Sequence, residues 1–228
     1  MISINSFKAQ LHPRECKDFI VEHTKVLQVF DIANITSAKT DWAFSNSCII
    51  ITIRNSANNQ MIGGGRIQLA SDSLPLPIET AVGAMDNRIY EVINQHRAEG
   101  TAEFCGLWNT RQTAKLGIGS AFLGNLVIAV ASQLNINSLF ALCAPTTVNS
   151  AIKQGFVVQQ NLGKNGTFYY PKLDLVATAV KIPNIRTIEY AQIDNRKYIL
   201  DLRANPVQIR TEVPRKDQVH IQYDLLIK

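Results

Sequence analysis

The sequence predicts a mixed α/β fold (α+β mixed), in which a central mixed sheet carries helices on both faces and a β-rich extension follows at the C-terminal end. Short runs of β-branched and aromatic residues alternate with stretches whose apolar residues recur at helical spacing. Their order along the chain is strand, helix, hairpin, helices, and then strands alternating with helices, which is typical of a sheet covered on both sides. At 228 residues, the chain is long enough for one such domain with a sizeable core.

The chain begins with a predicted strand and helix. Residues 2–10 form a short strand, and Pro13 opens a helix because proline is tolerated in the first turn. Apolar residues recur through the following segment at helical spacing, so this helix is expected to cover one face of the sheet. The polar segment 34–47 is expected to be an exposed loop.

A hairpin and a helical segment come next. The β-branched run 48–54 predicts a buried strand, and residues 61–69 supply the return strand. The glycines at 63–65 lie inside this hairpin, where glycine indicates a bulge or a close approach of two backbones more often than a phosphate site. Residues 78–99 are expected to form one or two exposed helices.

The stretch Thr101–Phe156 holds the strongest functional signal. It contains an apolar strand to Trp108, a loop that ends in Gly117-Ile118-Gly119-Ser120, a long apolar helix, a second strand at 139–143 and a short helix before Gly155-Phe156. A glycine loop between a strand and a buried helix directs several backbone N–H groups and the positive end of the helix dipole at one point. We therefore expect an anion to bind there.

A membrane span is a weaker interpretation of the same helix. Residues 116–152 contain no charged residue and no histidine, and 116–134 has about the 20 residues that a bilayer requires. Four polar residues interrupt that segment, so a helix buried in a globular core explains it better. No secretory signal is visible at the N-terminus, so a cytoplasmic location without membrane association is expected.

Composition limits the remaining classes of function. The chain is 46% hydrophobic and 18% charged, which is ordinary for a globular protein, and its net charge of +5 favours anionic partners. No basic run interleaved with aromatic residues is present, so a nucleic-acid partner is not expected. The histidines have no metal-ligand spacing, and no metal site is predicted. Cys16, Cys48, Cys105 and Cys143 are widely spaced and are expected to be reduced and buried.

The composition changes at Pro183, which divides the chain into a predicted domain at 1–182 and an extension at 183–228. The extension is about 30% charged against about 15% before it. Four strand-like runs predict that it is a half-exposed β structure; they lie at 187–191, 197–202, 207–213 and 219–227.

The central stretch resembles the core of the GNAT superfamily of N-acyltransferases. The resemblance covers about residues 100–160 closely and rests on Glu103–Trp108 as the central strand, Lys115–Leu123 as the acyl-carrier loop and Asn149–Phe156 as the closing helix and turn. It implies acyl-CoA, or the phosphopantetheine of an acyl carrier protein, as donor, a small-molecule amine as acceptor and no tightly bound cofactor. A homodimer stays open.

The resemblance also implies a donor site made largely of backbone groups. In that family, loop amides bind the pyrophosphate of coenzyme A, and the central strand separates from its neighbour to pair with the pantetheine arm. Here Cys105 and Leu107 would face that arm, with the Leu107 N–H as oxyanion donor. The loop group consists of Arg111, Lys115, Leu116, Gly117, Ile118, Gly119 and Ser120.

Amide formation from a thioester needs a base that removes the ammonium proton. Glu103 on the central strand is the first candidate, and its alternative role is a rim residue paired with a lysine. Glu79 is a second candidate base. Cys105 or Cys143 as a nucleophile is a weaker, third candidate, because the family usually transfers the acyl group directly to the amine.

Three positions differ from the family pattern. Ala114 replaces a basic or amide residue of the loop, Ala151 replaces the tyrosine that protonates the leaving thiolate, and Ala144-Pro145 replaces an asparagine. Three alternatives therefore stay open: a catalytically silent acyl-CoA-binding module, an enzyme similar to the acyl-homoserine lactone synthases that make autoinducers, and a scaffold protein that assembles through its β extension.

Overall fold

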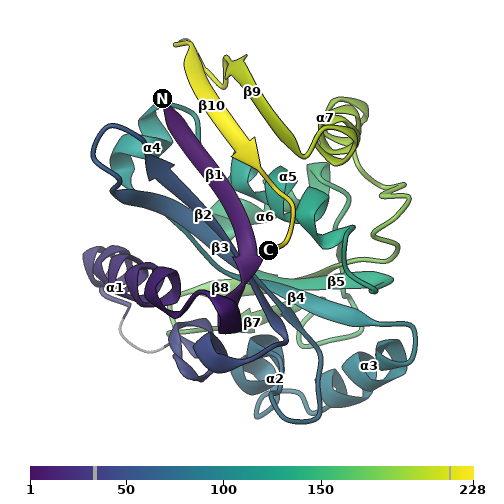
Figure 1. The fold of residues 1–228 in the computed structure, drawn as a ribbon. Helices are drawn as coiled ribbons and strands as arrows, with labels where there is room; N and C mark the ends of the chain where they lie inside the picture. The colour runs from purple at the N-terminus through teal and green to yellow at the C-terminus, as the bar shows by residue number, and fades with distance from the viewer. Residues whose placement is uncertain (33–34, 216) are drawn as a thin grey trace.

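A computed structural model describes residues 1–32, 35–215 and 217–228. Ten strands form a single mixed sheet in the order β6-β8-β5-β4-β3-β2-β1-β10-β9, with β7 paired to β8 (Figure 1). The strands are β1 (Ile2–Lys8), β2 (Cys48–Asn55), β3 (Met61–Leu69), β4 (Thr101–Asn109), β5 (Ser138–Cys143), β6 (Val157–Val158), β7 (Thr167–Tyr169), β8 (Val176–Ile182), β9 (Val207–Glu212) and β10 (Val219–Asp224).

Helices cover both faces of the sheet, as the sequence predicts (Figure 1). On one face lie α1 (Pro13–Val29), α2 (Pro77–Val82) and α3 (Arg88–Arg97), each in contact with β4. On the other lie α5 (Ser120–Ala131), α6 (Pro145–Lys153) and α7 (Ile193–Ala204). The short helices are α4 (Arg111–Lys115), η1 (Ala9–Leu11), η2 (Thr36–Ala38) and η3 (Asp41–Phe44).

The apolar helix predicted after the glycine loop is the centre of the largest core cluster. Nine of the twelve residues of α5 are buried against the sheet and α7. This environment explains why the helix is apolar on nearly all sides. None of the helices in the described ranges is long and apolar enough to cross a membrane.

The two central strands separate halfway along their length. β4 and β5 are parallel and pair from Thr101–Ser138 to Phe104–Ala141, and from Cys105 onward the β5 edge of β4 has no strand partner. A bulge lies at the same point, because Gly64 pairs with Trp108 while Arg66 pairs with Cys105. Within the bulge, Gly106 has a φ of 58°, a conformation that glycine adopts without strain.

The glycines at 63–65 mark a close backbone approach and not a phosphate site. A Cβ on Gly64 would lie 2.5 Å from the Ile51 carbonyl oxygen and 2.8 Å from Cε2 of Phe19. The glycines therefore let β3 lie between β2 and β4 beneath α1. All four cysteines are buried and free of disulfides, as expected.

Three sequence-based expectations about local structure are wrong. The run 197–202 lies in α7 and not in a strand, and 187–191 contains no strand. The segment expected to be an exposed loop carries Trp42, which is 3% exposed and packs edge-on against Phe19. The last two strands of the extension are correct, and β10 pairs in parallel with β1, so the extension continues the main sheet.

Candidate active site

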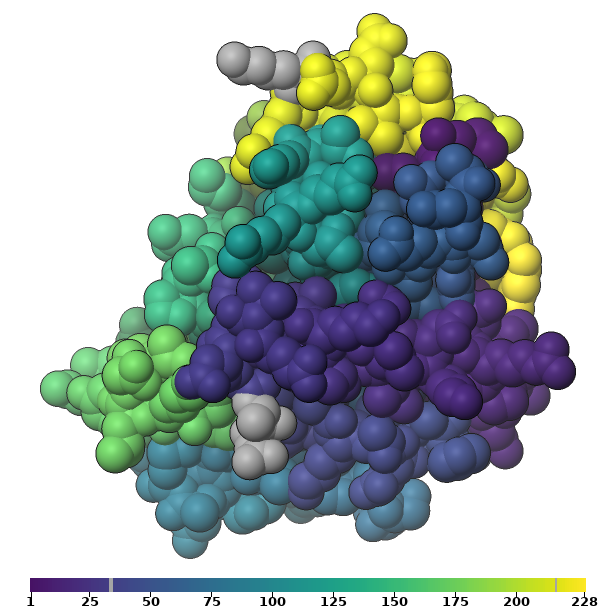
Figure 2. Space-filling model, turned by 90° about the vertical axis from the view of Figure 1, so that its left-hand side faces the viewer, coloured from purple at the N-terminus to yellow at the C-terminus, as the bar shows by residue number. Residues whose placement is uncertain are grey.

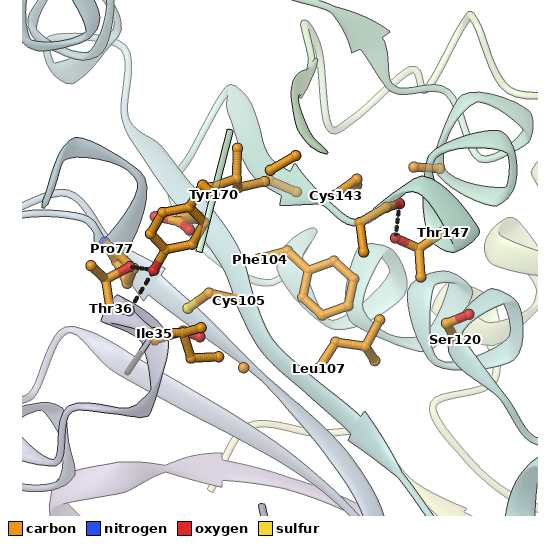
Figure 3. A pocket seen from close by; sticks show the side chains of 18 of the residues that line it. Ile35, Thr36, Pro77, Phe104, Cys105, Leu107, Ser120, Cys143, Thr147 and Tyr170 are labelled. Carbon is orange, nitrogen blue, oxygen red and sulfur yellow. Dashed lines mark hydrogen bonds between the residues drawn. The ribbon is translucent and has the colours of Figure 1, made fainter. Parts of the chain in front are cut away.

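A cavity of about 280 Å³ lies where β4 and β5 separate (Figure 3). Its floor comes from the ends of both strands, including Phe104, Leu107 and Cys143. One wall is formed by the end of α1 and the segment that follows it, and another by α6 and the residues after β7. Tyr170 and Pro171, which follow β7, also line it. Most lining side chains are apolar.

Glu103 lies in this cavity and is 2% exposed. Its Oε2 accepts a hydrogen bond of 2.7 Å from the Ile78 N–H of α2. The pKa of the Glu103 carboxyl is raised to about 8, mainly by burial; the Ile78 N–H and Arg66 oppose this shift, and the charge of Glu79 adds to it. No lysine pairs with it among the described residues, so Glu103 is not the lysine-paired rim residue considered as an alternative.

Glu79, the second candidate base, is buried outside the residues that line the cavity. Its Oε2 accepts a 2.7 Å hydrogen bond from the Leu76 N–H at the start of α2. Its Oε1 lies 3.8 Å from Nη2 of Arg97. These contacts fit a role in holding the first turn of α2, the helix whose Ile78 N–H binds Glu103.

The glycine loop lies at the α5 end of the site. The N–H groups of Leu116, Gly117 and Ile118 already bond to carbonyls of α4. By contrast, the N–H of Gly119 has no hydrogen-bond acceptor among the described residues, and a Cβ on Gly119 would meet nothing within 4 Å there. The first turn of α5 follows, and its N–H groups have no carbonyl four residues earlier in the helix. The available amides are therefore those from Gly119 into α5, and Ser120 lines the cavity.

The C-terminal hairpin reaches the same loop. Gly117 has a φ of 82°, and a Cβ on it would lie 2.7 Å from Cβ of Pro214 and 2.9 Å from Cγ of Arg215. Figure 2 shows this yellow hairpin lying over the teal residues of the loop region. Arg111 and Lys115 are exposed on α4 beside it and do not line the cavity. The loop is thus surrounded by basic side chains from two parts of the chain.

The cysteines in the cavity are poor nucleophiles. Burial raises the pKa of the Cys105 thiol to about 12 and that of Cys143 to about 11. The thiolate is the reactive form, so both groups are unreactive near neutral pH. Cys105 and Leu107 line the cavity on the unpaired part of β4, where the resemblance predicts contact with the pantetheine arm.

Sequence reasoning missed two polar groups of the site. His23 of α1 is 4% exposed, lines the cavity and stacks on Trp108 with ring centroids 6.4 Å apart. The Tyr170 hydroxyl accepts a hydrogen bond of 2.7 Å from the Thr36 N–H, joining the segment after α1 to the segment after β7. Figure 2 shows these segments side by side, dark blue against green. His23 and Tyr170 reach the cavity only through the tertiary fold. The run of aromatic residues at 168–170 could have marked Tyr170 in the sequence.

The position of the missing tyrosine also lies in the cavity. Ala151 of α6 is a lining residue, and Thr147, one turn earlier, lies on the same side (Figure 3). The Thr147 hydroxyl donates to the Ala144 carbonyl at 3.0 Å. The α6 wall near Ala151 therefore presents hydroxyl groups and no phenol.

Comparison with known proteins relates the chain to acyltransferases through structure. No family model and no curated sequence matches it. Among solved structures, FeeM, an N-acyl amino acid synthase from uncultured soil microbes, matches with a TM-score of 0.64 at 13% identity over 85% of this chain and 95% of that one. BjaI, a CoA-dependent acyl-homoserine lactone synthase solved with SAM and isopentyl-CoA, matches with 0.54 at 12% identity over 95% and 96%. An acyl-CoA N-acyltransferase from Pseudomonas aeruginosa matches with 0.54 at 10% identity over 79% and 99%. The chain therefore has the fold of the GNAT N-acyltransferases.

Proposed function

We propose that this protein is an N-acyltransferase that moves an acyl group from the phosphopantetheine thiol of acyl-CoA, or of an acyl carrier protein, to an amine. The observation that carries the proposal is the opening between β4 and β5, which has unpaired strand backbone along one side and a buried carboxyl group at Glu103. The acyl transfer catalysed by the structural neighbours supports it.

The donor would extend from the start of α5 to the unpaired edge of β4. Amides from Gly119 into the first turn of α5 would bind a phosphate, because they have no acceptor among the described residues and lie at the positive end of the helix dipole. The pantetheine arm would pair with the β4 edge beside Cys105 and Leu107. This places the thioester carbonyl near the bulge, where the Leu107 N–H would stabilise the oxyanion.

The reaction is direct attack. The amine nitrogen forms a bond to the thioester carbonyl carbon, and the carbon–sulfur bond breaks. The ammonium form of the acceptor gives up two protons, of which one reaches Glu103 and then solvent, while the other ends on the departing sulfur. The Ser120 hydroxyl, which lines the cavity, would stabilise that sulfur in place of the phenol that Ala151 lacks, because the Thr147 hydroxyl already donates to the Ala144 carbonyl.

The raised pKa of Glu103 predicts how this reaction depends on pH. With a pKa of about 8 the carboxyl is mostly protonated at pH 7 and cannot accept a proton there. Turnover is therefore expected to rise between pH 7 and pH 9. Because the acceptor amine also ionises near this range, the contribution of Glu103 is the part of the pH dependence that Glu103→Gln removes.

The test is thiol release from acetyl-, octanoyl- and dodecanoyl-CoA, and from the matching acyl carrier proteins, across a panel of amines, with the amide identified by mass spectrometry. Amine-dependent thiol release is expected for at least one donor. Binding without turnover would identify the protein as the catalytically silent alternative, and no binding of any donor would reject the proposal.

A further inference from the structure

His23 of α1 is a buried polar side chain that lines the cavity and makes no hydrogen bond among the described residues. It is 4% exposed, and the side-chain hydrogen bonds of histidine in the described ranges belong to His96 and His220. Burying a polar group without a hydrogen-bond partner destabilises the fold, so buried polar groups are usually paired with protein, water or a ligand. An unpaired imidazole in the wall of a cavity therefore indicates a polar ligand group that pairs with it.

Two aromatic side chains hold the His23 ring in place. Its centroid lies 5.9 Å from that of Phe19, one turn earlier in α1, and 6.4 Å from that of Trp108, with an angle of 20° between the stacked planes. Both aromatic side chains are buried. A ring fixed in this way loses little conformational freedom when a ligand binds, so its hydrogen bond is available to hold that ligand.

His23 belongs to the end of the cavity opposite the predicted phosphate site. Its helix, α1, contacts η2 and β4. Figure 3 shows Thr36 of η2 and Pro77 of α2 together at one end of the cavity, and Ser120 of α5 at the other. With the donor phosphate at the start of α5, the acceptor amine would occupy the end formed by α1, η2 and α2.

Two titratable side chains, His23 and Glu103, line this end with an atom that can accept a hydrogen bond from an amine. Arg66 is the charged group nearest to His23, and burial together with that charge lowers the pKa of the imidazole to about 4. The ring is therefore neutral at pH 7, and one of its nitrogens can only accept. His23 offers this lone pair whether the Glu103 carboxyl is protonated or ionised.

The chemistry of amide formation gives these two acceptors different tasks. A primary ammonium group has three N–H bonds, of which two are lost during acylation and one stays on the amide nitrogen. In the proposed mechanism Glu103 receives a proton that leaves. The N–H that stays needs an acceptor that does not remove its proton, and a neutral imidazole of lowered basicity meets this need.

We infer that His23 is an acceptor-binding residue that accepts a hydrogen bond from the N–H kept in the product amide, and that the site thereby selects primary over secondary amines. This inference rests on the proposed function and adds to it a residue and a class of acceptor. A secondary amine has no N–H to keep, so it would turn a carbon substituent toward the imidazole and leave the ring unpaired.

The experiment compares the primary amine that is acylated fastest in the panel with its N-methyl derivative, for example benzylamine with N-methylbenzylamine. The wild type is expected to show a kcat/KM at least about tenfold higher for the primary amine, since about tenfold is the effect of one hydrogen bond. His23→Leu removes the acceptor nitrogen and is expected to raise the KM for the primary amine about tenfold with little change in kcat, which reduces the ratio toward one. His23→Gln keeps an acceptor oxygen and is expected to retain most of the preference.

His220→Leu serves as the matched control, because His220 is exposed on β10, bonds to Thr211 and does not line the cavity. It is expected to leave the ratio unchanged. Should His23→Leu fail to fold, as judged by circular dichroism, the wild-type ratio and NMR of histidine labelled with nitrogen-15 carry the test. The ring nitrogen signals of His23 are expected to shift when the primary amine is added with coenzyme A, and those of His220 are not.

Equal kcat/KM for the two amines in the wild type, a preference that His23→Leu leaves intact, or His23 signals that do not shift would each overturn the inference and leave the acyltransferase proposal standing. A fall in kcat of about a hundredfold in His23→Leu, equal for both amines, would make His23 a proton acceptor in the chemical step and also overturn the inference. If no amine of the panel is acylated, the proposed function is rejected, and the inference with it.

Discussion

Replacing Glu103 with glutamine should change how the stability of the protein depends on pH. Glutamine keeps the shape of the side chain and can still accept the Ile78 N–H, but it cannot ionise. In the folded protein the pKa of Glu103 is raised from 4.5 to about 8, mainly by burial. At about 1.4 kcal/mol per pH unit, this shift lowers the free energy of unfolding by at most about 5 kcal/mol as the pH rises from below 4.5 to above 8.

The stability of the wild type falls as the pH rises, because Glu103 ionises at a lower pH in the unfolded chain than in the folded protein. Below pH 4.5 the carboxyl is protonated in both states, and its contribution to stability is fully present. As the pH rises toward 8, the unfolded chain ionises while the folded protein does not, so the free energy of unfolding falls. The carboxyl's contribution is therefore lost between pH 4.5 and about 8, and glutamine has no such loss.

The assay is urea unfolding at pH 5, 7 and 9 for the wild type and Glu103→Gln. We expect the variant to gain stability relative to the wild type as the pH rises, by several kcal/mol between pH 5 and pH 9. Glu189→Gln, at an exposed glutamate, is the matched control and should follow the wild type. If the free energy of unfolding changed with pH in the same way for wild type and Glu103→Gln, the assignment of a buried, neutral carboxyl at this site would be refuted.

Three further substitutions test the loop and the cavity wall. Gly117→Ala places a side chain at a positive φ and against Pro214, so it should lower the free energy of unfolding by about 1 to 2 kcal/mol in urea; unchanged stability would contradict the packing of the hairpin on the loop. Ser120→Asp should keep or slightly raise the melting temperature, because an acidic residue stabilises a helix N-terminus. It should raise the KM for the donor at least about tenfold, because it repels the donor's phosphate. A KM equal to that of Ser120→Asn would place the phosphate elsewhere. Tyr170→Phe removes the acceptor of the Thr36 N–H and should cost about 1 kcal/mol of stability and raise the acceptor KM, so unaltered kinetics would show that this contact does not shape the site.

Local sequence patterns predicted the elements that build the site, because each is marked by strong and local chemistry. The run at 48–54 is rich in β-branched residues, the helix after Gly119 is apolar at most positions, and both occur as expected. The run 197–202, predicted as a strand, lies in α7; this helix buries only two residues, Ile199 and Leu202, and so shows little helical periodicity.

The properties of the site depended on contacts distant in the sequence and could not be predicted. The pKa of Glu103 is raised because the fold buries its carboxyl, while Ile78 of α2, 25 residues earlier, donates an N–H that partly opposes the shift. His23 enters the cavity only because α1 packs across β3 and β4. Nothing in the local sequence marks Arg66 as buried, and the Nε atom of Arg66, which has no hydrogen-bond partner among the described residues, is visible only in the fold.

The central claim is that the opening between β4 and β5 transfers an acyl group from a phosphopantetheine thioester to an amine with Glu103 as base. The most direct measurement is the rate of amide formation, followed by mass spectrometry with acyl-CoA and the preferred amine, for wild type and Glu103→Gln from pH 6 to pH 9. We expect the wild-type rate to rise through about pH 8, with a rate for Glu103→Gln that is at least about a hundredfold lower at pH 9. Equal rates for the two proteins would contradict the role of Glu103, and no amide at any pH would contradict the acyltransferase itself.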